Sequence, residues 1–141
     1  MAGWRTVCMA WATVLATGLA TLAAEAAPGA WIADRAAPTL YQRGRVYETT
    51  ALLPRATTPV TGRAISRVAW RHDYGMAGAP VTGRLCGAGR CVDASAPRGI
   101  SDAFAGLPPQ TAFYFRFRVD GRGALTPARH GAPLQLVVNF E

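Results

Sequence analysis

Two cysteines separated by four residues are the part of this sequence best suited, by residue type and spacing, to do chemistry. Cys86 and Cys91 enclose the turn-forming segment Gly87–Arg90, and apolar and polar residues alternate on either side of it. This pattern predicts a β-hairpin with a four-residue loop, in which the two cysteines face each other. Such a pair can form a disulfide, or it can supply two ligands to a zinc site that a histidine completes.

The predicted hairpin sorts its neighbouring residues onto two faces, because side chains alternate along a strand. Leu85 and Val92 are expected on the buried face together with Val81. Arg84 and Asp93 are expected opposite each other on the outer face, beside the cysteines. A disulfide across so short a loop contributes roughly 2 kcal/mol on a chain-entropy estimate. We therefore expect the hairpin to be a locally stable unit.

Residues suited to acid–base or metal catalysis are sparse. The two histidines are His72, on the apolar face of a predicted strand, and His130, in a predicted loop. Neither lies near a Cys, Asp or Glu at the spacing of metal ligands, and the Gly-x-Ser-x-Gly pattern of serine hydrolases does not occur. We therefore interpret His72 as a packed histidine, and we predict no enzyme activity, no catalytic residues, no metal and no cofactor.

The remaining candidate for a functional site is a surface rich in arginine. Arg67 and Arg71 fall on the polar face of one strongly alternating segment, and Tyr114, Arg116 and Arg118 fall on the polar face of another. If these segments are neighbouring strands, their polar faces combine into a surface suited to binding carboxylates or to stacking. An ordinary solvated sheet face is the alternative interpretation.

Residues 1–26 have the pattern of a secretory signal peptide. Arg5 precedes an uncharged apolar run from Thr6 to Leu22, and Ala24-Glu25-Ala26 matches the A-x-A cleavage pattern. We expect cleavage after Ala26; the alternative, a membrane anchor, needs an apolar run of about 20 residues. The mature chain is thus expected to be exported without stable membrane insertion. Export favours the disulfide over zinc, because disulfides persist in oxidising compartments.

Residues 27–141 have the length of a single domain. The chain carries fifteen basic residues, all of them arginine, against eight acidic residues, which gives a net charge of +7. The use of arginine alone, with many Ala, Gly and Pro residues, indicates codon bias in a GC-rich genome; a preference for bidentate contacts is the functional alternative. The positive charge permits an acidic partner or surface, and export argues against nucleic acid.

Alternation of apolar and polar residues predicts an all-β fold. In Thr111–Asp120 the apolar positions are three phenylalanines and Val119, which indicates a half-buried strand. No segment has the spacing of a long amphipathic helix, and Ser101–Phe104 fits either one helical turn or a short strand. About seven or eight short strands favour a small antiparallel β-sandwich, with a small β-barrel as the alternative. The other expected strands, besides the hairpin, are Trp31–Ile32, Val46–Thr50, Ala64–Tyr74 and Leu134–Phe140.

An ordered series of short motifs in this chain resembles the flagellar protein FlhE family. The motifs are Gly29-Ala30-Trp31, Pro38-Thr39-Leu40, Arg43-Gly44, Val68-Ala69-Trp70-Arg71, Arg84-Leu85-Cys86, Cys91-Val92, Ala103-Phe104, Leu107-Pro108, Phe115–Val119, Gly123-Ala124-Leu125, Pro127-Ala128 and Val137–Phe140. No single motif is diagnostic, and the specificity lies in their order along nearly the whole mature chain. The loop Met76–Pro80 departs from the pattern.

The resemblance implies a periplasmic, non-enzymatic accessory protein of the bacterial flagellum. Such a protein is a chaperone-like or regulatory factor for flagellar export and assembly, with export, rod or hook components as its partners. Only the cysteine pair carries over from the family as a defined feature. A periplasmic glycan- or peptidoglycan-binding β-sandwich is the alternative function, and it would use Trp31, Tyr114 and the arginines.

Overall fold

Ten short strands form the framework of residues 29–141, the part of the chain that the computed structural model describes. The predicted signal peptide, residues 1–26, lies outside the described residues. No helix occurs between residues 29 and 141. The strands are β1 (Gly29–Arg35), β2 (Leu40–Gln42), β3 (Tyr47–Glu48), β4 (Ile65–Asp73), β5 (Val81–Gly87), β6 (Arg90–Asp93), β7 (Arg98–Ser101), β8 (Phe113–Val119), β9 (Ala124–Arg129) and β10 (Ala132–Phe140).

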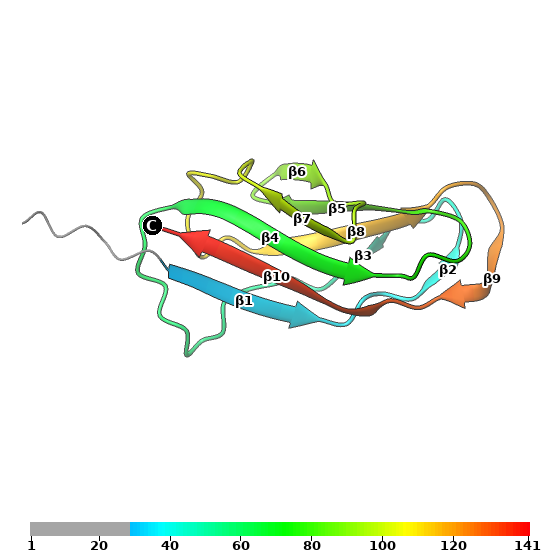
Figure 1. The fold of residues 1–141 in the computed structure, drawn as a ribbon, viewed down its shortest axis with the longest axis horizontal. Helices are drawn as coiled ribbons and strands as arrows, with labels where there is room; N and C mark the ends of the chain where they lie inside the picture. The colour runs from blue at the N-terminus through cyan, green and yellow to red at the C-terminus, as the bar shows by residue number, and fades with distance from the viewer. Residues whose placement is uncertain (1–28) are drawn as a thin grey trace, which may run out of the picture.

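The strands form two four-stranded sheets and one two-stranded ribbon. One sheet has the order β1-β10-β4-β7 and is called the β10 sheet; the other has the order β3-β8-β5-β6 and is called the β8 sheet. The ribbon of β2 and β9 lies at one end of the molecule, on the right in Figure 1. All pairings are antiparallel. The predicted antiparallel β-sandwich is confirmed, and the sheets do not close into a barrel.

The core lies between the two sheets and is built from the alternating apolar positions. Phe113, Phe115 and Phe117 of β8 are fully buried, as the alternation predicts. The facing β10 sheet contributes buried side chains such as Val68 of β4 and Leu136 of β10. Each buried side chain of this size contributes about 1.5–3 kcal/mol relative to exposure. The same alternation directs the polar residues of these strands outward.

The β5–β6 hairpin has the predicted register but a shorter loop than predicted. Cys86 pairs with Cys91, and Gly87 also pairs with Arg90, so only Ala88 and Gly89 form the loop. Both loop residues have positive φ, 49° for Ala88 and 76° for Gly89. Two-residue loops with this geometry match the twist of antiparallel strands and are therefore favoured in hairpins.

The short elements differ most from the prediction. Of the segment Val46–Thr50, only Tyr47 and Glu48 form a strand, β3. Thr49 then stops the strand by accepting a hydrogen bond from the Phe115 amide with its Oγ1 atom (3.0 Å). β7 ends at Ser101 and a turn follows, so Ser101–Phe104 is neither a helical turn nor a strand. The ribbon strands β2 and β9 are not predicted by the alternation.

Candidate binding surfaces

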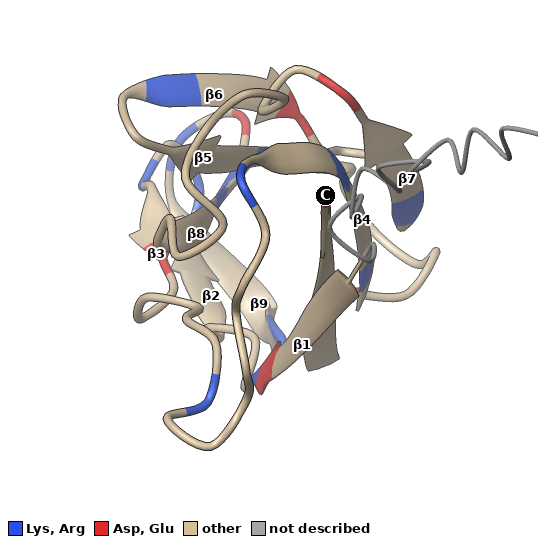
Figure 2. Ribbon diagram, turned by 90° about the vertical axis from the view of Figure 1, so that its left-hand side faces the viewer, with Lys and Arg blue, Asp and Glu red and all other residues tan. Residues whose placement is uncertain are grey.

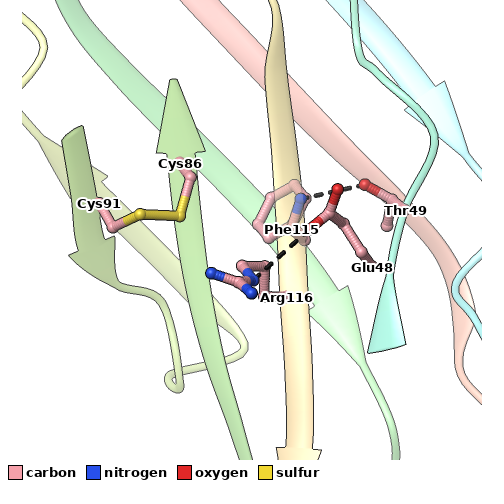
Figure 3. The surroundings of a disulfide bond; sticks show 6 residues. All are labelled: Glu48, Thr49, Cys86, Cys91, Phe115 and Arg116. Atoms are coloured by element: carbon pink, nitrogen blue, oxygen red, sulfur yellow. Dashed lines mark hydrogen bonds and ion pairs between the residues drawn. A yellow bond between two sulfur atoms is a disulfide. The ribbon is translucent and has the colours of Figure 1, made fainter. Parts of the chain in front are cut away.

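The two cysteines of the hairpin form a disulfide that joins β5 to β6 (Figure 3). The sulfur atoms of Cys86 and Cys91 are 2.03 Å apart, and their Cα atoms are 4.1 Å apart. The bond lies on the outer side of the hairpin, as predicted, because the adjacent Leu85 packs into the core. Cys86 is nevertheless only 1% exposed, since Tyr114 of β8 and Cys91 of β6 flank it. Both thiols are consumed, so the zinc alternative is wrong for this pair.

The five residues predicted to form one binding face lie on two different faces. Strand β4 lies in the β10 sheet and strand β8 lies in the other sheet, so the condition for a shared face, that these two strands are neighbours, is not met. Arg67 and Arg71 lie on the outer side of the β10 sheet, and Tyr114, Arg116 and Arg118 lie on the outer side of the β8 sheet. Basic residues therefore occur on strands of both sheets (Figure 2). Alternation fixes the side to which a residue points, but it does not determine which strands pair.

Acidic side chains neutralise the arginines on the β8 sheet. Arg116 Nε lies 3.5 Å from Glu48 Oε2 (Figure 3), and Arg118 Nε lies 3.6 Å from Asp120 Oδ1. Hydrogen bonds from Ser95 lower the pKa of the Asp93 carboxyl, which therefore stays ionised. One row of charged residues crosses this sheet from strand to strand, in the order Glu48, Arg116, Arg84 and Asp93. This face carries its own counter-charges.

A shallow hollow on the β8 sheet adjoins this charged row. It measures about 290 Å³ and is lined by Val46, Thr82, Arg84, Arg116, Phe117, Arg118 and Asp120. Tyr114 is half-buried on the same side of β8. The lining holds three guanidinium groups and one carboxylate, and two of these arginines, Arg116 and Arg118, already form ion pairs with Glu48 and Asp120.

His72 is a packed core histidine, as interpreted from the sequence, and is 4% exposed. Its Nε2 atom donates to the carbonyl oxygen of Ala94 (2.6 Å), and its Nδ1 atom has no hydrogen-bond partner within the described chain. The edges of Phe115 and Phe117 pack against the imidazole ring, with centroids 6.2 and 5.1 Å away. Burial lowers the pKa of His72, so the ring is neutral. This geometry suits packing, because the ring is almost completely enclosed and its Nε2 atom is used in a hydrogen bond to the backbone.

The described residues contain neither a metal-ligand cluster nor a membrane helix. No group of three or more His, Cys, Asp or Glu side chains lies close enough to hold a metal ion between residues 29 and 141. Within the same residues, no helix is long and apolar enough to cross a membrane.

Comparison with known proteins identifies one family. A family model described as flagellar protein FlhE matches residues 37–141. The flagellar protein FlhE of Salmonella typhimurium is 34% identical over 116 residues, which cover 82% of this chain and 87% of the relative; the protein of the same name from Salmonella typhi matches equally.

A solved structure agrees with the sequence comparison. The crystal structure of FlhE superimposes with a TM-score of 0.74 at 33% sequence identity, and the match covers 82% of this chain and 99% of the solved one. The resemblance seen in the ordered motifs is therefore confirmed in both sequence and fold. The chain belongs to the FlhE family of flagellar proteins.

Proposed function

We propose that this protein is a periplasmic accessory factor of the bacterial flagellum, which acts by binding and not by catalysis. In this role it is a chaperone-like or regulatory factor for flagellar export and assembly. The observation that carries the proposal is the FlhE family match over residues 37–141. The partners are flagellar components that are exposed in the periplasm, such as export, rod or hook proteins.

Two further features support a periplasmic location. The Cys86–Cys91 disulfide needs an oxidising compartment to persist. The apolar run and A-x-A pattern in residues 1–26 are typical of a cleaved signal peptide. Together they favour action outside the cytoplasm, where no nucleic acid is expected as a partner.

The glycan-binding alternative loses one of its aromatic residues. Trp31 is only 1% exposed, and its Nε1 atom donates to the carbonyl oxygen of Pro109 (2.7 Å). Its ring is therefore a core element and cannot stack on a sugar. Tyr114 is half-buried beside the disulfide, so of these two aromatic residues only Tyr114 is accessible to a sugar.

Affinity capture of purified components by the mature protein tests the proposal. The mature protein, purified from periplasm with its disulfide intact, is immobilised and offered a mixture of purified rod and hook subunits and soluble peptidoglycan fragments. We expect retention of a flagellar subunit and no retention of wall fragments. Retention of wall fragments alone would instead favour the glycan-binding function.

A further inference from the structure

The outer side of the β10 sheet carries a continuous row of apolar side chains. The register aligns one residue from each of its four strands, in the order Ile32, Val137, Ala69 and Ile100. These four residues are called the apolar row. Its end members are well exposed, 49% for Ile32 and 67% for Ile100, and its middle members are half-buried. Exposed apolar side chains aligned in this way mark an interaction surface more often than scattered ones do.

Two arginines that form no ion pair among the described residues lie beside the apolar row. Arg71 of β4 and Arg98 of β7 are directly paired across the strands and are both exposed. Neither forms an ion pair within residues 29–141. A hollow of about 190 Å³ is lined by Ala69, Trp70, Arg71, Arg98, Gln135 and Val137. Like charges placed directly opposite each other are destabilising, so this pair is a feature that an anionic partner would relieve.

The β8 sheet provides an internal comparison. Arg84 and Arg116 are also paired directly across neighbouring antiparallel strands. There, however, Glu48 faces Arg116 and Asp93 faces Arg84, so carboxylates flank the two arginines. Carboxylates thus flank the arginine pair of the β8 sheet in its cross-strand row, whereas none is directly opposite Arg71 or Arg98 on the β10 sheet. The apolar row adjoins the pair of Arg71 and Arg98, whereas Tyr114 and the Cys86–Cys91 disulfide adjoin the pair of Arg84 and Arg116.

The short edge strand β7 holds Arg98 and Ile100 in place. Between them, Gly99 lies against the ring of Trp70, and a Cβ atom at this position would collide with that ring. Trp70 Nε1 in turn donates to the carbonyl oxygen of Ala96 (3.1 Å), just before β7 begins. The contact fixes the strand so that its two larger side chains both point outward.

We propose that this face of the β10 sheet docks an acidic amphipathic helix of a protein partner. The apolar row crosses three strand spacings, about 14 Å, which matches about ten residues or three turns of helix. A helix is the suitable form because the backbone of the sheet is already hydrogen-bonded within it, so a segment lying on the face must satisfy its own backbone groups. A carboxylate beside the helix's apolar stripe would pair with Arg71 and Arg98, each of which can bind it in bidentate fashion.

Acidic residues lie at both ends of the apolar row. They favour a partner that carries a few discrete carboxylates over a partner with a uniformly anionic surface. Asp34 lies two residues from Ile32, on the same side of β1, where it accepts a hydrogen bond from Gln135 Nε2 (3.0 Å). At the other end, Asp102 lines a hollow together with Arg67, Ile100 and Glu141. A flat anionic membrane or polymer would meet these carboxylates, whereas a helix can place its charges between them.

Peptide binding tests this proposal directly. The probe is a labelled, end-capped helical peptide about 18 residues long, with leucines at i, i+3, i+4 and i+7 and glutamates flanking them; a matched peptide has lysines in place of the glutamates. Fluorescence anisotropy with the mature, disulfide-intact protein should show binding of the acidic peptide only. Added salt should weaken this binding, because exposed ion pairs are screened.

Matched variants locate the binding face. The double variant Arg71→Ala/Arg98→Ala should weaken binding of the acidic peptide about tenfold, the loss of roughly two exposed ion pairs. The control, Arg84→Ala/Arg116→Ala, removes an equivalent pair from the β8 sheet and should change the affinity by less than about twofold. For the apolar row, Ile100→Ser should weaken binding, while Val46→Ser, at an exposed apolar residue near the β8 sheet, should not.

A charge reversal makes the test independent of folding defects. The variant Arg71→Glu/Arg98→Glu should lose the acidic peptide and gain the lysine peptide. No binding of the acidic peptide by the native protein, equal binding of both peptides, or equal losses in the two alanine pairs would overturn the proposal. Stronger binding to vesicles containing anionic lipid, with dependence on Arg71 and Arg98, would replace the helix by a membrane surface.

This inference rests on the proposed flagellar role, and a cellular experiment separates the two. In a strain lacking the gene, the two alanine pairs are compared with the native chain for restoration of normal flagellation. If only Arg71→Ala/Arg98→Ala fails, both proposals stand. If that variant restores flagellation fully, the docking face is wrong and the flagellar role stands. If the deletion has no flagellar defect, the proposed function fails whatever the peptide data show.

Discussion

His72 shows how a single buried side chain makes stability depend on pH. Its Nδ1 atom has no hydrogen-bond partner within the described chain. Burial therefore lowers the pKa of His72 in the folded state, against the partial opposing effects of the Ala94 and Ala96 carbonyls and of Asp73. Below about pH 6.5 the unfolded chain binds a proton that the folded chain does not. The free energy of unfolding should therefore fall as the pH drops through this range.

Urea unfolding at about pH 8 and about pH 5.5, on either side of the histidine pKa in unfolded chains, measures this effect. His72→Gln keeps a donor for the Ala94 carbonyl but does not titrate, so its stability should depend less on pH than that of the native protein. His130 is exposed and is unchanged in the variant, which makes the comparison specific. Equal pH dependence in both proteins would show that His72 does not contribute.

The Cys86–Cys91 disulfide should stabilise the hairpin without being required for folding. It closes a loop of few residues, for which the chain-entropy estimate gives about 2 kcal/mol. We therefore expect Cys91→Ser to lower the free energy of unfolding by about this amount and to leave the fold intact. Denaturant unfolding measures the loss, and far-ultraviolet circular dichroism reports the fold. Two labelled thiols in the native, non-reduced protein would contradict the presence of the bond.

At the scale of the strand, the register of β8 can be tested by two adjacent truncations. Phe115 is fully buried and stacks on Phe117 with centroids 5.7 Å apart, whereas the Arg116 side chain is 45% exposed. Phe115→Ala should cost about 3–5 kcal/mol of stability, and Arg116→Ala well under about 1 kcal/mol. Chemical denaturation of both variants gives the two values. Reversed costs would mean that the strand is displaced by one residue, since such a slip exchanges its faces.

Strands with strict alternation could be predicted from the sequence, and short or irregular ones could not. β4, β8 and β10 bury every second side chain over most of their length, so their pattern is clear. β7 has only four residues, and Gly99 takes one of its inward positions. β9 contains Pro127, which cannot donate to a ladder and lowers the strand signal. These short elements are set by contacts with distant residues, which local patterns do not record.

The candidate site was predictable only in part, for a related reason. The outward direction of Arg67, Arg71, Arg116 and Arg118 follows from alternation, but their division between two sheets depends on long-range pairing. The sequence does not single out Arg98 and Ile100, because the four residues of β7 show no clear alternation of apolar and polar side chains. Arg98 lies opposite Arg71, and Ile100 lies opposite Ala69, only because β7 pairs with β4 in this register. Cross-strand rows of this kind become visible once the topology is known.

For the whole molecule, charge distribution matters more than the net charge of +7. On the β8 sheet, Glu48 and Asp120 form ion pairs with arginines and Asp93 faces Arg84, while Arg71 and Arg98 on the β10 sheet form no ion pair among residues 29–141. The two faces of the sandwich thus differ in what they offer to a partner. The proposed binding function needs one open face, and it needs a stable framework, which the core and the disulfide provide.

Complementation with an exported and a retained copy is the most direct measurement of the proposed role. In a strain lacking the gene, one plasmid supplies the full chain and another supplies the chain without residues 2–26, at matched protein levels. Flagella on the cell surface and flagellar structures inside the periplasm are then counted by electron microscopy. We predict that the full chain restores normal flagellation and that the retained copy does not. Normal flagella in the deletion strain, or equal restoration by the retained copy, would contradict a flagellar function exerted in the periplasm.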